Sequence, residues 1–251
     1  MLDPSWHHAA ALAVIATGVF TAATLVWMPA PYGRHGTGGW GPQIPPRWGW
    51  ILMECPSVFA FLAFYLQGKH AGEMLPLLLL FVWQAHYIHR TLIFPFRLRN
   101  QGKPMPLSIA AMGMAFNLVN SWLNATQISE YGDYSTWQMD PRLWIGLAVF
   151  ALGFGINLHA DTVLIHLRKP GETGYKIPHG GLYRWITCPN YFGEILEWTG
   201  WAIATWSVAG LSFALYTTAN LAPRAHTHHH WYHSKFPDYP KERKALLPGL
   251  W

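Results

Sequence analysis

Long stretches of this chain are apolar and carry almost no charge. No Asp, Glu, Lys or Arg occurs at 4–33, 104–129 or 198–223, while 48–68 carries only Glu54 and 74–96 only Arg90. Because a helix needs about 20 mostly apolar residues to cross a bilayer, each stretch can span one. The pattern predicts an all-α integral membrane protein with seven transmembrane helices, at 8–28, 49–68, 74–97, 106–126, 143–166, 188–206 and 208–227.

Composition supports this prediction and argues against a soluble protein. Hydrophobic residues make up 51% of the chain and charged residues 12%, against about 25% charged residues in soluble domains. The first apolar segment is longer than a signal-peptide core and has no basic residue before it, so we expect it to be retained. No second domain is indicated, and residues 1–251 are predicted to form a single membrane domain.

The basic residues predict the orientation. Fourteen of the 17 Lys and Arg lie in the loops 29–48, 97–105 and 167–187 and in the C-terminal tail. The positive-inside rule places these segments in the cytosol and the N-terminus outside. We therefore expect a multi-pass protein of the bacterial inner membrane or the endoplasmic reticulum. This cytosolic belt explains the net charge of +5 without a nucleic-acid partner.

Ionisable and polar residues inside the spans fall at one depth. Charged groups within spans are rare and usually functional. Five spans place such groups in their predicted cytosolic halves, which predicts a polar cavity open to the cytosol. These groups are Glu54; His86, Tyr87, His89 and Arg90; Asn157, His159 and Asp161; Asn190, Glu194 and Glu197; and Asn220 with Arg224.

Helical spacing orders these residues into stripes. Each predicted stripe holds residues three, four or seven apart, so that they share one helix face. Cations beside carboxylates and amides suit a ligand with phosphates, ribose hydroxyls and amides, such as a dinucleotide. A simpler interpretation of any single residue is an ion pair between helices, or aromatic packing for Tyr87. The stripes are Asn157, Asp161 and Arg168; Asn190, Glu194 and Glu197; and Arg224, His228 and Tyr232.

Two other patterns carry less information. The histidines between His226 and His233 could chelate a metal, but no cysteine accompanies them, and no metal site is predicted. Gly36, Gly38 and Gly41 fit G-x-G-x-x-G, but no strand precedes them and Pro42 follows, so this segment is interpreted as a loop.

The chain resembles the steroid 5α-reductase family over essentially its whole length. The resemblance rests on long motifs in the C-terminal half and on shorter ones, in the same order, in the N-terminal half. They are Leu167–Glu172, Tyr175–Leu182, Asn190–Trp198, Ala204–Ser207 and Asp238–Ala245, preceded by Tyr32–His35, Trp50–Pro56, His86–Thr91 and Asn100–Pro104.

The resemblance implies NADPH-dependent reduction of the Δ4 double bond of a 3-oxo-Δ4-steroid to the 5α-dihydro product, by hydride transfer to C5. It implies Glu54 and Tyr87 as the catalytic pair, with Met53 beside them in the substrate pocket. It also implies that 1–126 forms mainly the steroid pocket and 127–251 mainly the NADPH site. The implied cofactor contacts are Trp50, Arg90, Asn100, Lys103, Asn157, Asp161, Arg168, Tyr175, Asn190, Glu194, Arg224, His228 and Tyr232.

The sequence departs from the family pattern at two positions. Met53 stands where the family commonly has Gln, which removes a polar group beside the substrate carbonyl. Lys103 stands where Arg is frequent, which keeps the charge but loses the two-pronged guanidinium.

Three other functions stay open at this point. One is a reductase of another lipid-soluble enone or enoyl substrate. Another is a membrane methyltransferase of the isoprenylcysteine type, although Arg168 and Arg224 favour a phosphorylated cofactor. A non-enzymatic lipid-binding protein would leave the carboxylates unexplained. Expected partners are the steroid or enone and membrane lipid, with no obligatory protein partner.

Overall fold

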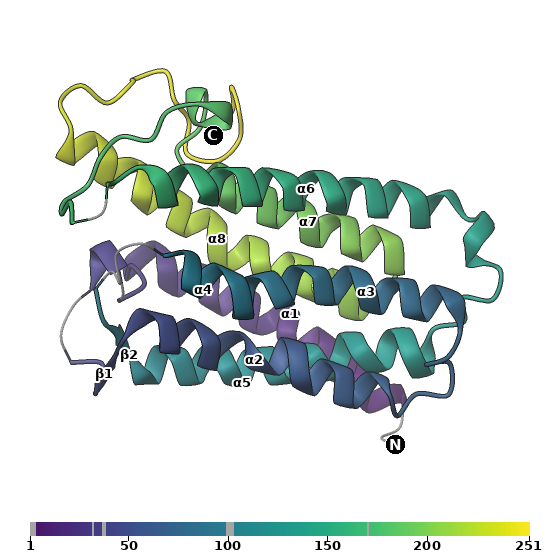
Figure 1. Ribbon diagram of the computed structural model, residues 1–251. Coiled ribbons are helices and arrows are strands. Elements are labelled where there is room, and N and C mark those ends of the chain that lie inside the picture. Colours follow the sequence, from purple (N-terminus) through teal and green to yellow (C-terminus); the bar gives the residue numbers. More distant parts are fainter. Residues whose placement is uncertain (1–3, 32, 37–38, 99–102, 170) are drawn as a thin grey trace. The chain divides into compact units, whose positions relative to one another are not determined.

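The computed structural model describes residues 4–31, 33–36, 39–98, 103–169 and 171–251, which fold mainly into helices (Figure 1). Each of the seven segments expected to be helical overlaps a helical segment, although 49–68 runs three residues past the end of its helix at Tyr65. The third of them has three parts, because a π-helical turn, η2, interrupts it. The helices are α1 (Pro4–Trp27), α2 (Pro46–Tyr65), α3 (Met74–Ile88) continued by η2 (His89–Ile93) and α4 (Phe94–Arg97), α5 (Leu107–Thr126), α6 (Pro141–His166), α7 (Pro189–Thr205) and α8 (Val208–Lys235).

Short elements lie between the helices. Strand β1 (Gln43–Ile44) pairs antiparallel with β2 (Met105–Pro106), which joins the segment before α2 to the segment before α5. Two-residue strands have no periodicity, and the sequence did not predict them. The other short elements are η1 (Gly33–His35), η3 (Gln127–Tyr131), η4 (Trp137–Met139) and η5 (Gly181–Arg184).

Among the described residues, four helical segments are long and apolar enough to cross a membrane: α1, α2, Met74–Arg97 and α6. In α5, α7 and α8 polar side chains interrupt the apolar sequence, such as Asn117 and Asn120 in α5 and Glu197 in α7. The all-helical class is thus confirmed. The number of seven spans and the orientation of the termini stay predictions.

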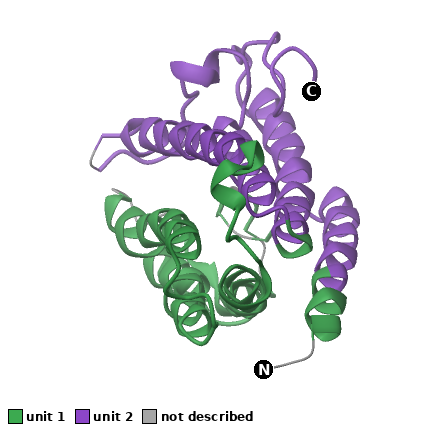
Figure 2. Cartoon of the chain, turned by 90° about the vertical axis from the view of Figure 1, so that its right-hand side faces the viewer, with its two compact units in different colours: residues 1–11, 30–143, 207–209 green, residues 12–29, 144–206, 210–251 purple. Residues whose placement is uncertain are grey.

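The chain divides into two compact units, coloured separately in Figure 2. Unit 1 consists of residues 1–11, 30–143 and 207–209, and unit 2 of the rest. The divisions fall inside α1, near the start of α6 and near the start of α8.

In unit 1, α2 packs against α5 and against α3. Phe61 of α2 stacks on Trp83 of α3, with ring centroids 4.3 Å apart. Trp83 Nε1 also donates a hydrogen bond of 2.9 Å to the carbonyl of Ser57. Pro56 lies inside α2 and has no N–H to offer the carbonyl of Leu52. The thiol of Cys55 donates to that carbonyl at 3.4 Å, so a side chain replaces part of the lost backbone bonding.

In unit 2, α6 and α7 run antiparallel with their backbones in contact. A Cβ added to Gly153 of α6 would overlap the backbone nitrogen of Glu197, and one added to Gly200 of α7 would overlap that of Phe150. Gly146 and Gly193 face the opposite helix in the same way. Small residues at such positions let helices approach closely, as is common between membrane helices.

The turn between α7 and α8 is as short as the sequence suggested. Trp206 ends α7 with φ 43°, a left-handed conformation in which its N–H reaches the carbonyl of Ala202. A non-glycine residue seldom adopts this conformation, so sequence rules for helix ends that look for glycine miss it. α8 begins two residues later, at Val208.

The glycine contact predicts an asymmetry between two neighbouring positions of α6. Gly153→Ala should lower the apparent melting temperature of the purified protein in detergent, because overpacking costs about 1–3 kcal/mol. The matched control is Gly155→Ala, where a Cβ would meet nothing within 4 Å. Equal melting temperatures for the two variants would contradict the close approach of α6 and α7.

Candidate functional site

Glu54 of α2 is held by a residue of α5. The side-chain amide of Asn117 donates to Glu54 Oε2 at 3.1 Å and to the carbonyl of Met53 at 2.8 Å. Asn117 is itself buried, with 6% of its surface exposed. Asn117 therefore orients the Glu54 carboxyl, which the family resemblance implies to be catalytic. The sequence patterns did not indicate a role for Asn117, although a polar amide inside an uncharged span is a signal of one.

Met53, one of the two departures from the family pattern, packs against α5. A Cβ added to Gly113 would overlap Met53 Cγ, and Sδ would also lie within 2.6 Å of it. The Met53 side chain thus fills the space that Gly113 leaves. The position beside Glu54 is apolar and is occupied by this packing.

Tyr87 of α3 is 3% exposed and lies among aromatic rings. Its ring centroid lies 4.9 Å from that of Trp83 and 4.8 Å from that of His86. Tyr87 and Glu54 come from α3 and α2, two helices in contact within unit 1.

Arg90 lies in the π-helical turn that follows α3. Its guanidinium carbon is 4.8 Å from the Trp50 ring centroid and 4.6 Å from that of Phe94. These two rings meet edge to face at 5.7 Å. The aromatic faces stabilise the cation by cation–π attraction and orient two predicted cofactor residues, Trp50 and Arg90, together. Phe94 is a member of this cluster that the sequence did not indicate.

Two further predicted residues follow α4. Lys103 is exposed. Asn100 lies outside the described residues.

In unit 2, the amides and carboxyls of α6 and α7 form one network. Asn157 Nδ2 donates to the carbonyl of Asn190 at 3.0 Å and to Glu194 Oε2 at 3.4 Å. Asn190 Nδ2 in turn donates to Asp161 Oδ1 at 3.2 Å. Asn157 and Asp161 are buried. The structure therefore brings together four predicted cofactor residues.

A second cluster links α7 to α8 through Tyr191. Arg224 donates to the Tyr191 hydroxyl at 3.2 Å and to Asn220 Oδ1 at 3.0 Å, and it lies over the Tyr191 ring at 5.3 Å. The same hydroxyl is 3.1 Å from His228 Nε2. Tyr191 thus positions two predicted cofactor residues. Tyr191 lies in the family motif Asn190–Trp198, but the sequence did not indicate its role.

Tyr232 and Tyr175 contact other aromatic side chains of unit 2. Tyr232 is buried and stacks on Tyr239, with ring centroids 5.1 Å apart. Tyr175 meets Trp231 edge to face at 4.8 Å. Tyr232 shares the helix α8 with Arg224 and His228, so that predicted stripe lies in one helix.

The predicted stripe of Asn157, Asp161 and Arg168 is wrong at its last member. α6 ends at His166, so Arg168 lies in the following loop and not on the helix face. There Arg168 Nη1 donates to the carbonyl of Gly174 at 3.1 Å, within a turn of the basic loop. Extrapolating the helical period past the last turn caused this error. Asn190, Glu194 and Glu197 all lie in α7, as predicted.

The histidines at the end of α8 have partners of their own. His229 Nδ1 is 2.6 Å from the Thr187 hydroxyl, which is 2.8 Å from the hydroxyl of Tyr239. His226 and His230 approach to 3.0 Å between their Nε2 atoms. Within the part of the chain that the structure describes, no group of three or more His, Cys, Asp or Glu is arranged to hold a metal ion.

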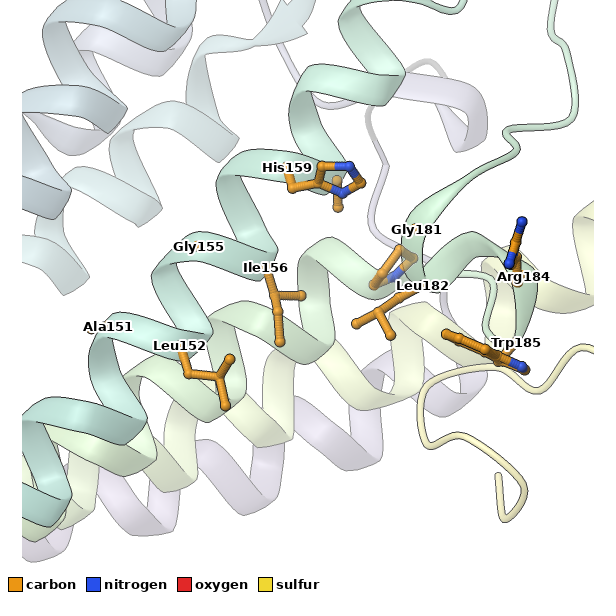
Figure 3. A pocket seen from close by; sticks show the side chains of 11 residues that line it. Ala151, Leu152, Gly155, Ile156, His159, Gly181, Leu182, Arg184 and Trp185 are labelled. Atoms are coloured by element: carbon orange, nitrogen blue, oxygen red, sulfur yellow. The ribbon is translucent and has the colours of Figure 1, made fainter.

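Unit 2 also contains a pocket of about 480 Å³ between α6 and the η5 segment (Figure 3). None of the predicted catalytic or cofactor residues lines it. The lining residues are Ala151, Leu152, Gly155, Ile156, His159, Ala160, Gly181, Leu182, Arg184, Trp185 and Pro189.

Apolar helices that bury carboxyls, amides and cations are typical of membrane-embedded enzymes, because such groups are costly in a membrane and are retained for function. Comparisons with known proteins agree with this class. A sequence profile of the family described as 3-oxo-5-alpha-steroid 4-dehydrogenase matches residues 103–251. The chain is 42% identical over 257 residues to the steroid 5-alpha-reductase DET2 of Gossypium hirsutum, covering 99% of each chain.

An animal relative gives the same result. The 3-oxo-5-alpha-steroid 4-dehydrogenase 1 of Homo sapiens is 44% identical over 227 residues, which cover 87% of this chain and 85% of the relative. The chain therefore belongs to the 3-oxo-5-alpha-steroid 4-dehydrogenase family and is an oxidoreductase. The resemblance stated from the sequence motifs is confirmed.

The histidine at the Thr187 hydroxyl predicts a pH dependence of stability. Burial, and to a smaller extent the neighbouring His233 and His230, lower the pKa of His229 to about 4. In the unfolded chain a histidine has a pKa of about 6.5. The unfolded state therefore takes up a proton first, and the folded protein should lose stability as the pH falls from about 6.5 to about 4.

Melting temperatures between pH 4.5 and 8 measure this effect. His229→Gln should flatten the decline below pH 6.5, whereas His8→Gln, at an exposed position of α1, should leave it unchanged. An unaltered pH profile of His229→Gln would rule out this histidine as a cause.

Proposed function

We propose that this protein reduces the Δ4 double bond of a 3-oxo-Δ4-steroid with NADPH, giving the 5α-dihydro product. The observation that carries the proposal is the pair of predicted carbonyl-binding groups, Glu54 and Tyr87, on adjacent helices, in a chain with 42–44% identity to steroid 5α-reductases. The relatives' names supply the substrate class, and the described side chains supply the chemistry.

The donor set fits NADPH. Its phosphates need cations, and the proposed ones are Arg224 and Arg90. Its ribose hydroxyls and carboxamide need amides and carboxyls, which the network of Asn157, Asp161, Asn190 and Glu194 supplies. Tyr191 holds Arg224 and His228 from one hydroxyl, so the cation is oriented before the cofactor arrives. The remaining proposed contacts are Trp50, Asn100, Lys103, Arg168, Tyr175 and Tyr232.

Bound NADPH supplies the hydride that adds to C5 of the steroid. Negative charge then develops on the C3 oxygen, and the site must stabilise this oxygen in the transition state. Tyr87 donates a hydrogen bond from its hydroxyl to the C3 oxygen. Glu54, as the neutral carboxylic acid, donates a second hydrogen bond to the same oxygen. Because Oε2 accepts the hydrogen bond from Asn117, the proton of this acid is held on Oε1. C4 is protonated from water.

In this proposal residues 1–126 form mainly the steroid pocket, and the steroid enters from the bilayer. All seven helical segments cross the membrane, with the N-terminus outside and the C-terminus in the cytosol. The polar site then opens to the cytosol, which contains NADPH. Met53 places a thioether, in contact with Gly113, beside Glu54. The carbonyl is thus held by Glu54 and Tyr87 without a third polar group at position 53.

Substrate consumption by the purified protein tests the reaction. NADPH oxidation should require a 3-oxo-Δ4-steroid, such as testosterone or progesterone, and should not occur with an enoyl thioester. The product should be the 5α-dihydro steroid. Turnover of the thioester alone would reject the steroid assignment, and binding of S-adenosylmethionine in place of NADPH would reject the reductase.

Two substitutions test the catalytic pair. Glu54→Gln and Tyr87→Phe should each lower kcat about 10²–10³-fold, the typical cost of losing one donor to a developing oxyanion. The dissociation constant for NADPH should stay nearly unchanged in both variants. Glu73→Gln, in the exposed turn before α3, is the matched control and should retain full kcat. Normal turnover in either catalytic variant contradicts its assignment.

A further inference from the structure

The face of α6 that lines the pocket differs from the face that holds the polar network. Ala151, Leu152, Gly155, Ile156 and His159 recur at one side of the helix, because residues four apart align along it. The opposite side carries Gly153, which contacts the backbone of α7, and the buried side chains of Asn157 and Asp161. One helix thus divides an apolar groove from the proposed cofactor site.

The groove is open and apolar along α6. Leu152 is 58% exposed, and a Cβ placed on Gly155 would meet nothing within 4 Å. The other wall is formed by Leu182 and by Trp185, which is 53% exposed (Figure 3). α6 is one of the segments long and apolar enough to cross a membrane. In a bilayer, this length of the groove would face hydrocarbon.

The other end of the groove is basic. Arg184 and His159 are exposed there, beside the loop that also carries Lys169 and Lys176. Arg184 is in no ion pair among the described residues, whereas Lys176 is paired with Glu172 at 2.6 Å. A Cβ on Gly181 would overlap the His159 ring. Glycine at this position therefore leaves room for the imidazole to line the groove.

We propose that this groove binds one anionic phospholipid. An acyl chain lies along Ala151, Leu152 and Gly155, and the phosphate lies against Arg184 and His159. Three observations select this occupant. The groove volume of about 480 Å³ is within the range of small-ligand pockets, about 300–1,000 Å³. Its apolar and basic ends match the two parts of a lipid. Trp185 lines the groove beside Arg184 (Figure 3), and Trp is enriched where chain and headgroup meet.

The charge of the groove decides which lipid binds. Basic pockets next to membrane helices bind phosphate-rich headgroups, and each cation near an anionic membrane surface strengthens attraction. A zwitterionic lipid offers the same chains but adds a cation that Arg184 repels. The site therefore distinguishes phosphatidylglycerol from phosphatidylcholine by the headgroup alone. It is independent of the reductase chemistry, because no residue proposed for catalysis or cofactor binding lines it.

Native mass spectrometry of the delipidated protein, titrated separately with phosphatidylglycerol and phosphatidylcholine, tests the site. The wild-type protein should bind one phosphatidylglycerol more tightly than phosphatidylcholine. Arg184→Gln should weaken phosphatidylglycerol binding about five-fold, the effect of losing one surface cation. Gly155→Leu, which fills the groove, should weaken the binding of both lipids. NADPH oxidation should be unchanged in every variant under saturating substrate.

Matched controls separate the groove from general surface effects. Lys169→Gln removes a cation from the same loop, and Ala148→Leu adds similar bulk about two turns earlier on the same side of α6, outside the groove. Both should bind lipid like the wild type. Equal affinity for the two lipids, or losses of equal size in the controls, would overturn the proposal. Arg184→Gln changes an exposed side chain, so its lipid affinity decides the question even if Gly155→Leu does not fold.

Discussion

The amide of Asn157 reaches α7 only because the backbones of α6 and α7 touch. Glycines on both helices remove the side chains that would otherwise separate them. The short distance lets one amide contact both the carbonyl of Asn190 and the carboxylate of Glu194. Inside a membrane this arrangement has a second role, because hydrocarbon offers no partner to a polar group. The close packing of the two helices thus also supplies the hydrogen-bond partners that their polar side chains need inside a membrane.

In unit 1 a different contact provides a partner for a polar group between apolar helices. Asn117 spans from α5 to α2 and bonds both the Glu54 carboxyl and the Met53 carbonyl. A glycine again provides room, since Gly113 receives the Met53 side chain. In each unit a small residue and an amide therefore act together. The small residue sets the separation of the helices, and the amide uses that separation to fix a carboxyl group.

Much of this could be predicted from the sequence. Apolar stretches with few or no charges located the long helices of the described residues, because charged side chains are rare in membrane-spanning segments. Helical spacing placed Arg224, His228 and Tyr232 on one helix correctly. Spacing failed at Arg168, because helix ends depend on local capping. It also missed Asn117 and Tyr191, whose roles arise from contacts between helices far apart in the chain. Such contacts leave no periodic signal along a single helix.

The π-helical turn at His89–Ile93 gives the third helical segment two separate faces. An α-helix advances about 100° per residue, so the extra residue of a π turn rotates everything after it by about that angle. Tyr87 lies before this turn, and Phe94 lies after it. Phe94 can therefore join Trp50 around the guanidinium of Arg90 without sharing the stripe that buries Tyr87. A helical wheel drawn through residues 74–97 with one continuous period misassigns one half of the segment. Deleting a single residue from the turn would re-phase the whole of α4 against α2 while leaving the hydrophobicity of the segment almost the same.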